Sequence, residues 1–112
     1  MRILITGAAG FIGYSLALKI LENKKIKVFG IDNLNSYYEI SLKKERLKKL
    51  FFFSNFKFFK LNIENEKLLT KIFIENKIDY VIHLAAQAGV RHSLKKPETY
   101  IQANINGFFN II

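Results

Sequence analysis

Hydrophobic residues along this chain alternate between two spacings, and the alternation predicts a regular succession of strands and helices. We expect strands at the short apolar runs, which cover residues 3–5, 26–31, 56–61 and 79–84. Elsewhere apolar residues recur at three- and four-residue intervals, which is typical of helices that cover a core. These helical segments are residues 11–23, 39–50, 65–76 and a last helix that begins near Pro97.

The same spacing predicts which side chains face the core. In the second helical segment we expect Leu47 and Leu50 to point inward. The fourth strand is nearly all apolar, as expected of a strand that is covered on both faces. Two further sets of apolar residues have helical spacing: Ile12, Leu16, Ala17, Ile20 and Leu21 in the first helical segment, and, on one face of the third, Leu68, Leu69, Ile72 and Phe73.

Four strand–helix repeats define the fold class. Right-handed crossovers between successive strands give a parallel sheet with helices on both faces. We therefore predict an α/β chain, a Rossmann-type doubly wound parallel sheet whose first four strands lie in the order 3-2-1-4. A single domain would cover residues 1–112.

Composition narrows the possible functions. Half of the 112 residues are hydrophobic, which suffices for one small core, and no apolar run approaches the roughly 20 residues of a membrane span. Cysteine is absent, so we expect no disulfides and a reducing, cytoplasmic location. The net charge of +9 fits either a nucleic-acid partner or dispersed, solvated lysines. Because the lysines are scattered, we favour solvation and expect neither a nucleic-acid nor a membrane partner.

The most informative stretch is Thr-Gly-Ala-Ala-Gly-Phe-Ile-Gly at residues 6–13, which follows the first strand and opens a helix. Gly7 would permit the tight turn, Gly10 would let the backbone approach a pyrophosphate, and Gly13 would allow close packing of helix on strand. The free N–H groups and positive dipole end of the helix would then face the phosphates. A plain tight turn is the alternative. The surrounding pattern favours a dinucleotide-binding βαβ unit.

An acidic residue, Asp32, ends the second strand, 19 positions after Gly13. Its carboxylate could accept hydrogen bonds from the two hydroxyls of a ribose and would repel a 2′-phosphate. This favours NAD over NADP. The alternative is a turn or helix-capping aspartate.

Polar residues at the ends of later strands are weaker candidates. Asn62 and Ile63 end the third strand, where an amide could bind an adenine edge or could cap the next helix. His83 lies on an apolar strand and is expected to be a packed core residue, with no metal-ligand spacing beside it. Arg91 lies beyond the fourth strand, where it could hold a phosphate or carboxylate or simply be solvated.

Taken together, these residues resemble the extended short-chain dehydrogenase/reductase family, and within it the UDP-glucuronate 4-epimerases and related nucleotide-sugar epimerases. The segments that carry the resemblance are TGAAGFIG at 6–13, GIDNLNSYY at 30–38, LKKERL at 42–47, HLAAQAGVRHS at 83–93 and NINGFFNII at 104–112. The segments at 37–47 and 87–91 favour the glucuronate subgroup over 4,6-dehydratases.

The resemblance implies a set of cofactor contacts. Phe11 and Ile12 would offer backbone N–H groups to the pyrophosphate, and Asn62 stands where the family usually has aspartate. The adenosine ribose would be surrounded by Asp32, Asn33 and Asn35, and the nicotinamide-side ribose by Leu84, Ala85, Ala86 and Gln87. Asn104 would lie beside the cofactor, while Arg91 and Ser93 would face a UDP-sugar.

The resemblance also implies a reaction. The family uses a Tyr-x-x-x-Lys pair to remove a hydroxyl proton while NAD takes a hydride, which gives a 4-keto sugar. None of the five tyrosines here has lysine four positions later. We therefore expect the NAD-binding, N-terminal part of a homodimeric epimerase, with no catalytic residue and no C-terminal substrate domain. The alternatives are part of a 4,6-dehydratase, a non-catalytic dinucleotide-binding module and a basic nucleic-acid binder.

Overall fold

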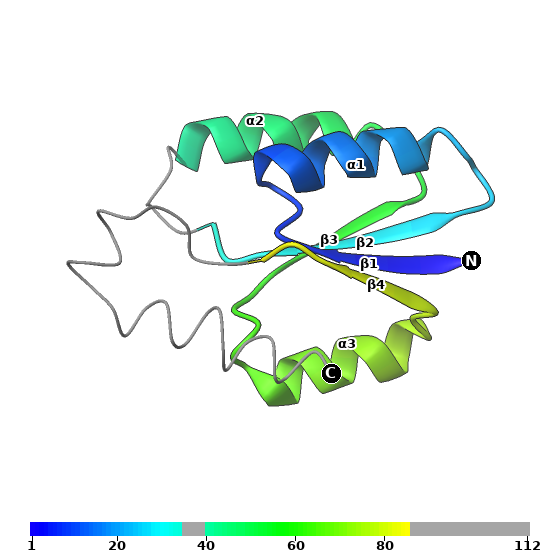
Figure 1. Ribbon diagram of the computed structural model, residues 1–112, viewed down its shortest axis with the longest axis vertical. Helices are drawn as coiled ribbons and strands as arrows, with labels where there is room; N and C mark the ends of the chain where they lie inside the picture. The colour runs from blue at the N-terminus through cyan, green and yellow to red at the C-terminus, as the bar shows by residue number, and fades with distance from the viewer. Residues whose placement is uncertain (35–39, 86–112) are drawn as a thin grey trace.

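Residues 1–34 and 40–85 are described by the computed structural model of the chain. Strands and helices alternate through these residues in chain order (Figure 1). Their bounds are β1 Arg2–Thr6, α1 Phe11–Leu21, β2 Lys27–Asp32, α2 Ile40–Leu50, β3 Phe56–Lys60, α3 Glu66–Asn76 and β4 Tyr80–His83. Each element predicted before residue 85 is present, with its ends shifted by one or two residues at most. The predicted helix after Pro97 lies outside the described residues.

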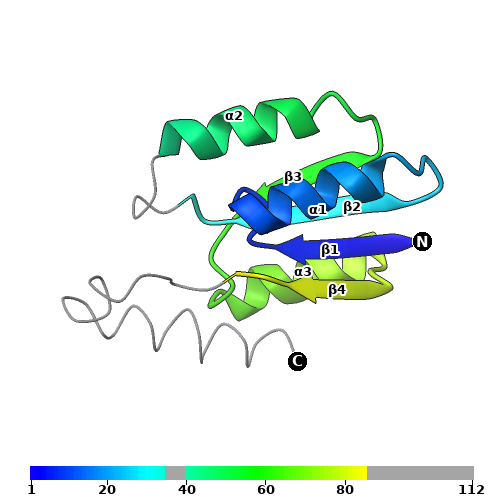
Figure 2. The same cartoon turned by 45° about the horizontal axis from the view of Figure 1, so that its top comes forward.

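The strands form one parallel sheet in the order β3-β2-β1-β4, as predicted. At the end of β1, Thr6 pairs with Ile31 of β2 on one side and with His83 of β4 on the other. Asp32, the last residue of β2, pairs with Lys60 of β3. The carboxyl ends of all four strands therefore meet at one edge of the sheet (Figure 2).

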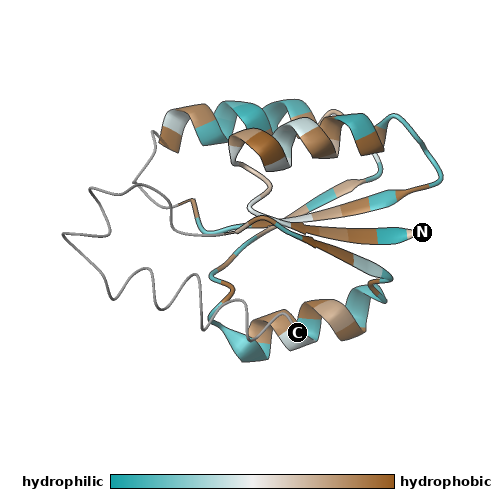
Figure 3. Ribbon diagram, viewed as in Figure 1, coloured by the Kyte–Doolittle hydropathy of each residue, from teal (hydrophilic) through white to brown (hydrophobic). Residues whose placement is uncertain are grey.

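Helices cover both faces of the sheet. Figure 1 shows α1 and α2 side by side on one face and α3 on the other. Each helix carries both hydrophilic and hydrophobic residues (Figure 3), as expected of helices that cover a sheet and also meet solvent. This three-layer arrangement is the doubly wound α/β architecture.

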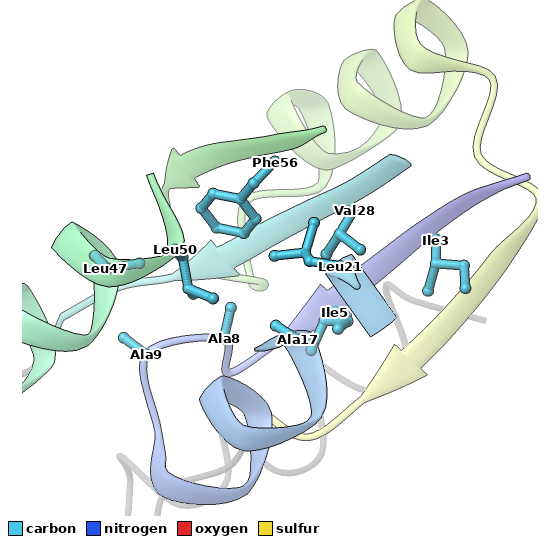
Figure 4. Close-up of a cluster of buried hydrophobic side chains, with 10 residues drawn as sticks. All are labelled: Ile3, Ile5, Ala8, Ala9, Ala17, Leu21, Val28, Leu47, Leu50 and Phe56. Carbon is cyan, nitrogen blue, oxygen red and sulfur yellow. The ribbon is translucent and has the colours of Figure 1, made fainter. Parts of the chain in front are cut away.

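Two apolar clusters hold the layers together. Figure 4 shows the cluster under α1 and α2, in which Leu21, Val28 and Leu50 are fully buried. Phe29 and Leu69 belong to the second cluster, under α3. Burial of a side chain of this size contributes about 1.5–3 kcal/mol, so these residues supply much of the free energy of folding.

Three apolar side chains of these elements are exposed, and for Leu68 and Tyr80 the expectation of burial was wrong. Ile12 is 66% exposed because the stripe of α1 that touches the sheet is Gly13, Ala17 and Leu21, about 100° around the helix from it. Leu68 is 45% exposed, for α3 turns Leu69 and Ile72 inward instead. Tyr80 of β4 is 59% exposed, since β4 pairs with β1 alone within the described residues.

Candidate functional site

The glycine-rich bend follows β1 at the carboxyl edge of the sheet. The N–H groups of Gly7 and Ala8 both donate to the carbonyl oxygen of Ile31, at 2.8 and 3.1 Å, which ties the bend to the end of β2. Gly7 has a φ of +72°, and a Cβ there would come within 2.9 Å of the Leu84 carbonyl. Both the turn and the close approach of the chain after β4 therefore require glycine here.

The other two glycines of the motif differ from each other. A Cβ on Gly13 would overlap the carbonyl oxygen of Gly7, so the packing of α1 on the bend requires glycine. A Cβ on Gly10 would meet one described atom within 4 Å, the same carbonyl oxygen, at 3.2 Å. Protein packing thus requires glycine at Gly7 and Gly13. At Gly10 the single contact is tight but could be relieved by a small shift, and the backbone there is only half-buried, so a ligand could approach it.

The amino end of α1 lies directly at Gly10. Gly10 is its N-cap, with no side-chain cap and no acidic residue in the first turn. The side chains of Phe11 and Ile12 are 73% and 66% exposed, so they do not cover the helix end. The first N–H groups of a helix lack intrahelical partners and carry the positive end of its dipole. An anion at this point would be stabilised by both.

Asp32 is buried, only 5% exposed, and its carboxylate is already engaged. Oδ2 accepts from the N–H of Ala9 at 3.0 Å, and Oδ1 accepts from the N–H of Leu34 at 2.8 Å and from Lys43 Nζ at 3.4 Å. A carboxylate offers about four acceptor positions, and bonds from the described residues fill three of them. Binding of ribose hydroxyls by Asp32 stays a prediction, and among the described residues Oδ2 accepts one bond against two at Oδ1.

Two basic residues of α2 complete the surroundings of the bend. Lys43 is 7% exposed and forms an ion pair with Asp32. Arg46, one turn further on, donates from Nη1 to the carbonyl oxygen of Ala9 at 3.0 Å, and its guanidinium lies 5.9 Å from the centre of the Phe11 ring. The peptide groups of Ala9 are thus held by Asp32 on one side and Arg46 on the other.

The sequence analysis missed both residues, because it expected the basic residues of the chain to be dispersed and solvated. A signal was present for Lys43. It stands four and seven positions before Leu47 and Leu50, in the same inward stripe. A lysine in an apolar stripe needs a buried acidic partner, because burial of an unpaired charge is costly.

At the ends of β2 and β3 the structure brings together two predicted residues. Asn33 donates from Nδ2 to Oδ1 of Asn62 at 2.7 Å, and both residues are exposed at the carboxyl edge. Asn62 does not cap the next helix, since the N-cap of α3 is Asn65, whose side chain accepts from the N–H of Leu68. Ile63 is only 6% exposed, and its side chain belongs to the core.

Thr6 joins the ends of β1 and β4. Its buried hydroxyl oxygen accepts from the N–H groups of Leu84 and Ala85, at 2.9 and 3.0 Å, and lies 2.7 Å from His83 Nδ1. These bonds hold Leu84 and Ala85, both predicted cofactor contacts, against the glycine bend. His83 is half-buried rather than part of either apolar cluster, and its burial lowers its pKa from the usual value.

The remaining predictions cannot be placed. Asn35, Ala86, Gln87, Arg91, Ser93 and Asn104 lie outside the described residues. Over residues 1–34 and 40–85, no three metal-ligating side chains come together. Within the same ranges, no helix is long and apolar enough to cross a bilayer.

The parallel sheet has the strand order 3-2-1-4. A glycine bend joins β1 to an uncapped helix, and an acidic residue ends β2. Together these features define a Rossmann-type dinucleotide-binding fold. The family model described as GDP-mannose 4,6 dehydratase matches residues 4–112. The chain belongs to that family, a branch of the extended short-chain dehydrogenases/reductases to which nucleotide-sugar epimerases also belong.

Several similar proteins are named UDP-glucuronate 4-epimerase. Over 112 residues the chain is 49% identical to protein CapI of Staphylococcus aureus, covering all of this chain and 33% of that protein. It is 46% identical over 109 residues to the UDP-glucuronate 4-epimerase of Thermodesulfobacterium geofontis, covering 97% and 33%.

A solved structure has the same architecture. The UDP-glucuronic acid 4-epimerase of Bacillus cereus, in complex with UDP-glucuronic acid and NAD, superposes with a TM-score of 0.86 at 38% identity. The match covers 98% of this chain and 34% of that one. The chain therefore spans about a third of the length of the relatives that it matches.

Proposed function

We propose that this chain binds NAD at the carboxyl edge of its sheet and is the cofactor-binding part of a nucleotide-sugar 4-epimerase. The observation that carries the proposal is the uncapped amino end of α1, whose N-cap is the half-buried Gly10 and whose first side chains, Phe11 and Ile12, are exposed. Packing requires the other two glycines of the motif, and a ligand that approaches the backbone would explain Gly10. A diphosphate is the group that such a helix end stabilises best.

The residues around this point fit an adenosine group. Among the described residues Asp32 Oδ2 accepts one bond, so it could also accept one from a ribose hydroxyl, and the exposed amides of Asn33 and Asn62 follow the ends of β2 and β3, where a base could reach them. Leu84 and Ala85 border Gly7 on the opposite side of β1, where the nicotinamide half would extend. NAD, when bound, supplies a hydride acceptor and donor.

The substrate that we propose is a UDP-sugar, with UDP-glucuronate first. This rests on relatives named for that activity at 38–46% identity. Arg91 and Ser93 are the side chains that we expect to face it. The whole protein is proposed to be a cytoplasmic homodimer.

Catalysis requires a group that takes the proton from a sugar hydroxyl. None of the five tyrosines in these residues is followed by lysine at the fourth position. We therefore propose that the 112 residues bind the cofactor but do not turn over substrate. Calorimetric titration with NAD tests the first part. Conversion of UDP-glucuronate to UDP-galacturonate, followed by NMR on the 112 residues and on the intact protein, tests the second.

One alternative has an observation of its own. The matching family model is described as a 4,6-dehydratase, and a dTDP-glucose 4,6-dehydratase from Bacillus anthracis is 26% identical with a TM-score of 0.78. The higher identity to 4-epimerases favours epimerisation. Release of water from a dTDP- or GDP-hexose, with no epimer formed, would favour the dehydratase instead.

A further inference from the structure

The buried ion pair between Lys43 and Asp32 has a consequence for cofactor choice. Lys43 Nζ lies 3.4 Å from Asp32 Oδ1, and the two side chains are 9% and 5% exposed. Two charges this close and this little hydrated interact far more strongly than a surface pair. The carboxylate that would meet the ribose therefore does not act as an isolated negative charge.

In dinucleotide-binding folds, an acid at the end of the second strand binds the 2′-hydroxyl and disfavours a 2′-phosphate, while a nearby basic residue accommodates one. This chain has both groups in contact. We infer that Lys43 is a specificity-determining residue, whose ammonium offsets the repulsion between Asp32 and a 2′-phosphate and so limits the preference for NAD over NADP.

This inference rests on the proposed binding of NAD at Asp32. The position of Lys43 on α2 is fixed by packing, because Leu47 and Leu50 of the same stripe lie in the core. The ammonium thus cannot move far from the carboxylate without unpacking the helix. Arg46 is held elsewhere, at the carbonyl of Ala9, which leaves Lys43 as the described cation paired with Asp32.

The test is the ratio of the dissociation constants for NADP and NAD, measured by calorimetry on the intact protein at about pH 8, where carboxylates are ionised. Lys43→Met keeps the length and apolar stem of the side chain but removes its charge. The ratio should rise about tenfold, through weaker NADP binding. Lys43→Arg should keep the ratio within about twofold of the wild type.

A matched control stands next in the sequence. Lys44 is exposed, so Lys44→Met changes the net charge equally without touching Asp32. Its ratio should stay within about twofold of the wild type, because solvent and salt screen an exposed charge. A merely structural role of Lys43 would weaken both cofactors together and leave the ratio unchanged.

A second pair of variants avoids an unpaired buried carboxylate. Asp32→Asn leaves the ammonium without its partner, so the affinity for NADP should gain about tenfold or more relative to the affinity for NAD, which lowers the ratio. Adding Lys43→Met to Asp32→Asn should abolish that gain, and this double variant carries no buried charge at either position. An unchanged or lowered ratio in Lys43→Met, or a gain that survives in the double variant, would overturn the inference. A wild-type protein that binds neither dinucleotide would instead refute the proposed function.

Discussion

The hydroxyl of Thr6 and the imidazole of His83 lie 2.7 Å apart, and this contact bears on which ring nitrogen carries a proton. The hydroxyl oxygen already accepts from two backbone N–H groups, at Leu84 and Ala85. An unprotonated His83 Nδ1 would accept the remaining hydroxyl hydrogen, and this arrangement favours the tautomer with its proton on Nε2. Burial lowers the pKa of His83, which also favours the neutral ring.

The first prediction concerns Thr6 itself. Thr6→Val keeps the shape of the side chain but leaves the N–H of Ala85 without its acceptor, and the N–H of Leu84 with only the Thr6 carbonyl oxygen, at 3.2 Å. We expect a loss of about 1–3 kcal/mol in the free energy of unfolding, because unsatisfied buried donors are costly. Urea denaturation measures it. Thr6→Ser is the control, since it retains the hydroxyl and should lose less; equal losses in the two variants would contradict the assigned role.

The second prediction is a pH dependence. Because the pKa of His83 is lowered in the folded chain, the unfolded chain takes up the proton more readily near pH 6.5. Stability is therefore fully present above that pH and falls as the pH drops below it, until the lowered pKa is passed. In His83→Gln this part of the loss should disappear. The other histidine offers a matched control, and His92→Gln should retain the loss; the reverse pattern would contradict the assignment.

The third prediction separates two glycines of one motif. Gly13→Ala should prevent α1 from packing on the bend and strongly destabilise the fold, because the added Cβ would overlap the Gly7 carbonyl. Gly10→Ala meets one atom at 3.2 Å and should fold, yet bind NAD at least about tenfold more weakly, since the methyl group occupies the approach to the pyrophosphate. Thermal melts and calorimetric titration measure the two effects. Unaltered affinity in a folded Gly10→Ala variant would refute the role of Gly10.

The fourth prediction concerns Arg46. Arg46→Met removes the hydrogen bond to Ala9 and the contact with the Phe11 ring. NAD affinity should fall about fivefold, because the bend loses one of its supports while little buried surface is lost. Lys49→Met, on an exposed position of the same helix, should bind NAD as the wild type does. Equal affinities in the two variants would show that the bend is rigid without Arg46.

The sheet and its helices could be predicted from the sequence because the spacing of apolar residues changes cleanly between strand and helix. The order of the strands followed from the handedness of the crossovers. Gly7 and Gly13 could also be predicted, since their roles depend on backbone geometry that adjacent residues dictate.

Other features depend on contacts between distant residues and could not be read from local pattern. The bonds that fill three acceptor positions of Asp32 come from Ala9, Leu34 and Lys43, and their convergence needs the tertiary fold. Capping by Asn65 rather than Asn62 depends on where the chain after β3 bends. The exposure of Ile12 depends on which stripe of α1 is small enough to approach the sheet.

The central claim is that a dinucleotide binds where the bend meets α1. Titration of the ¹⁵N-labelled chain with NAD, followed by amide NMR shifts, tests it most directly. We predict saturable shifts at Gly10, Phe11 and Ile12, and at Asn33 beside the ribose acceptor. Shifts confined to the opposite edge of the sheet, around Lys27 and Asp79, would contradict the account, as would no saturable shift at the start of α1.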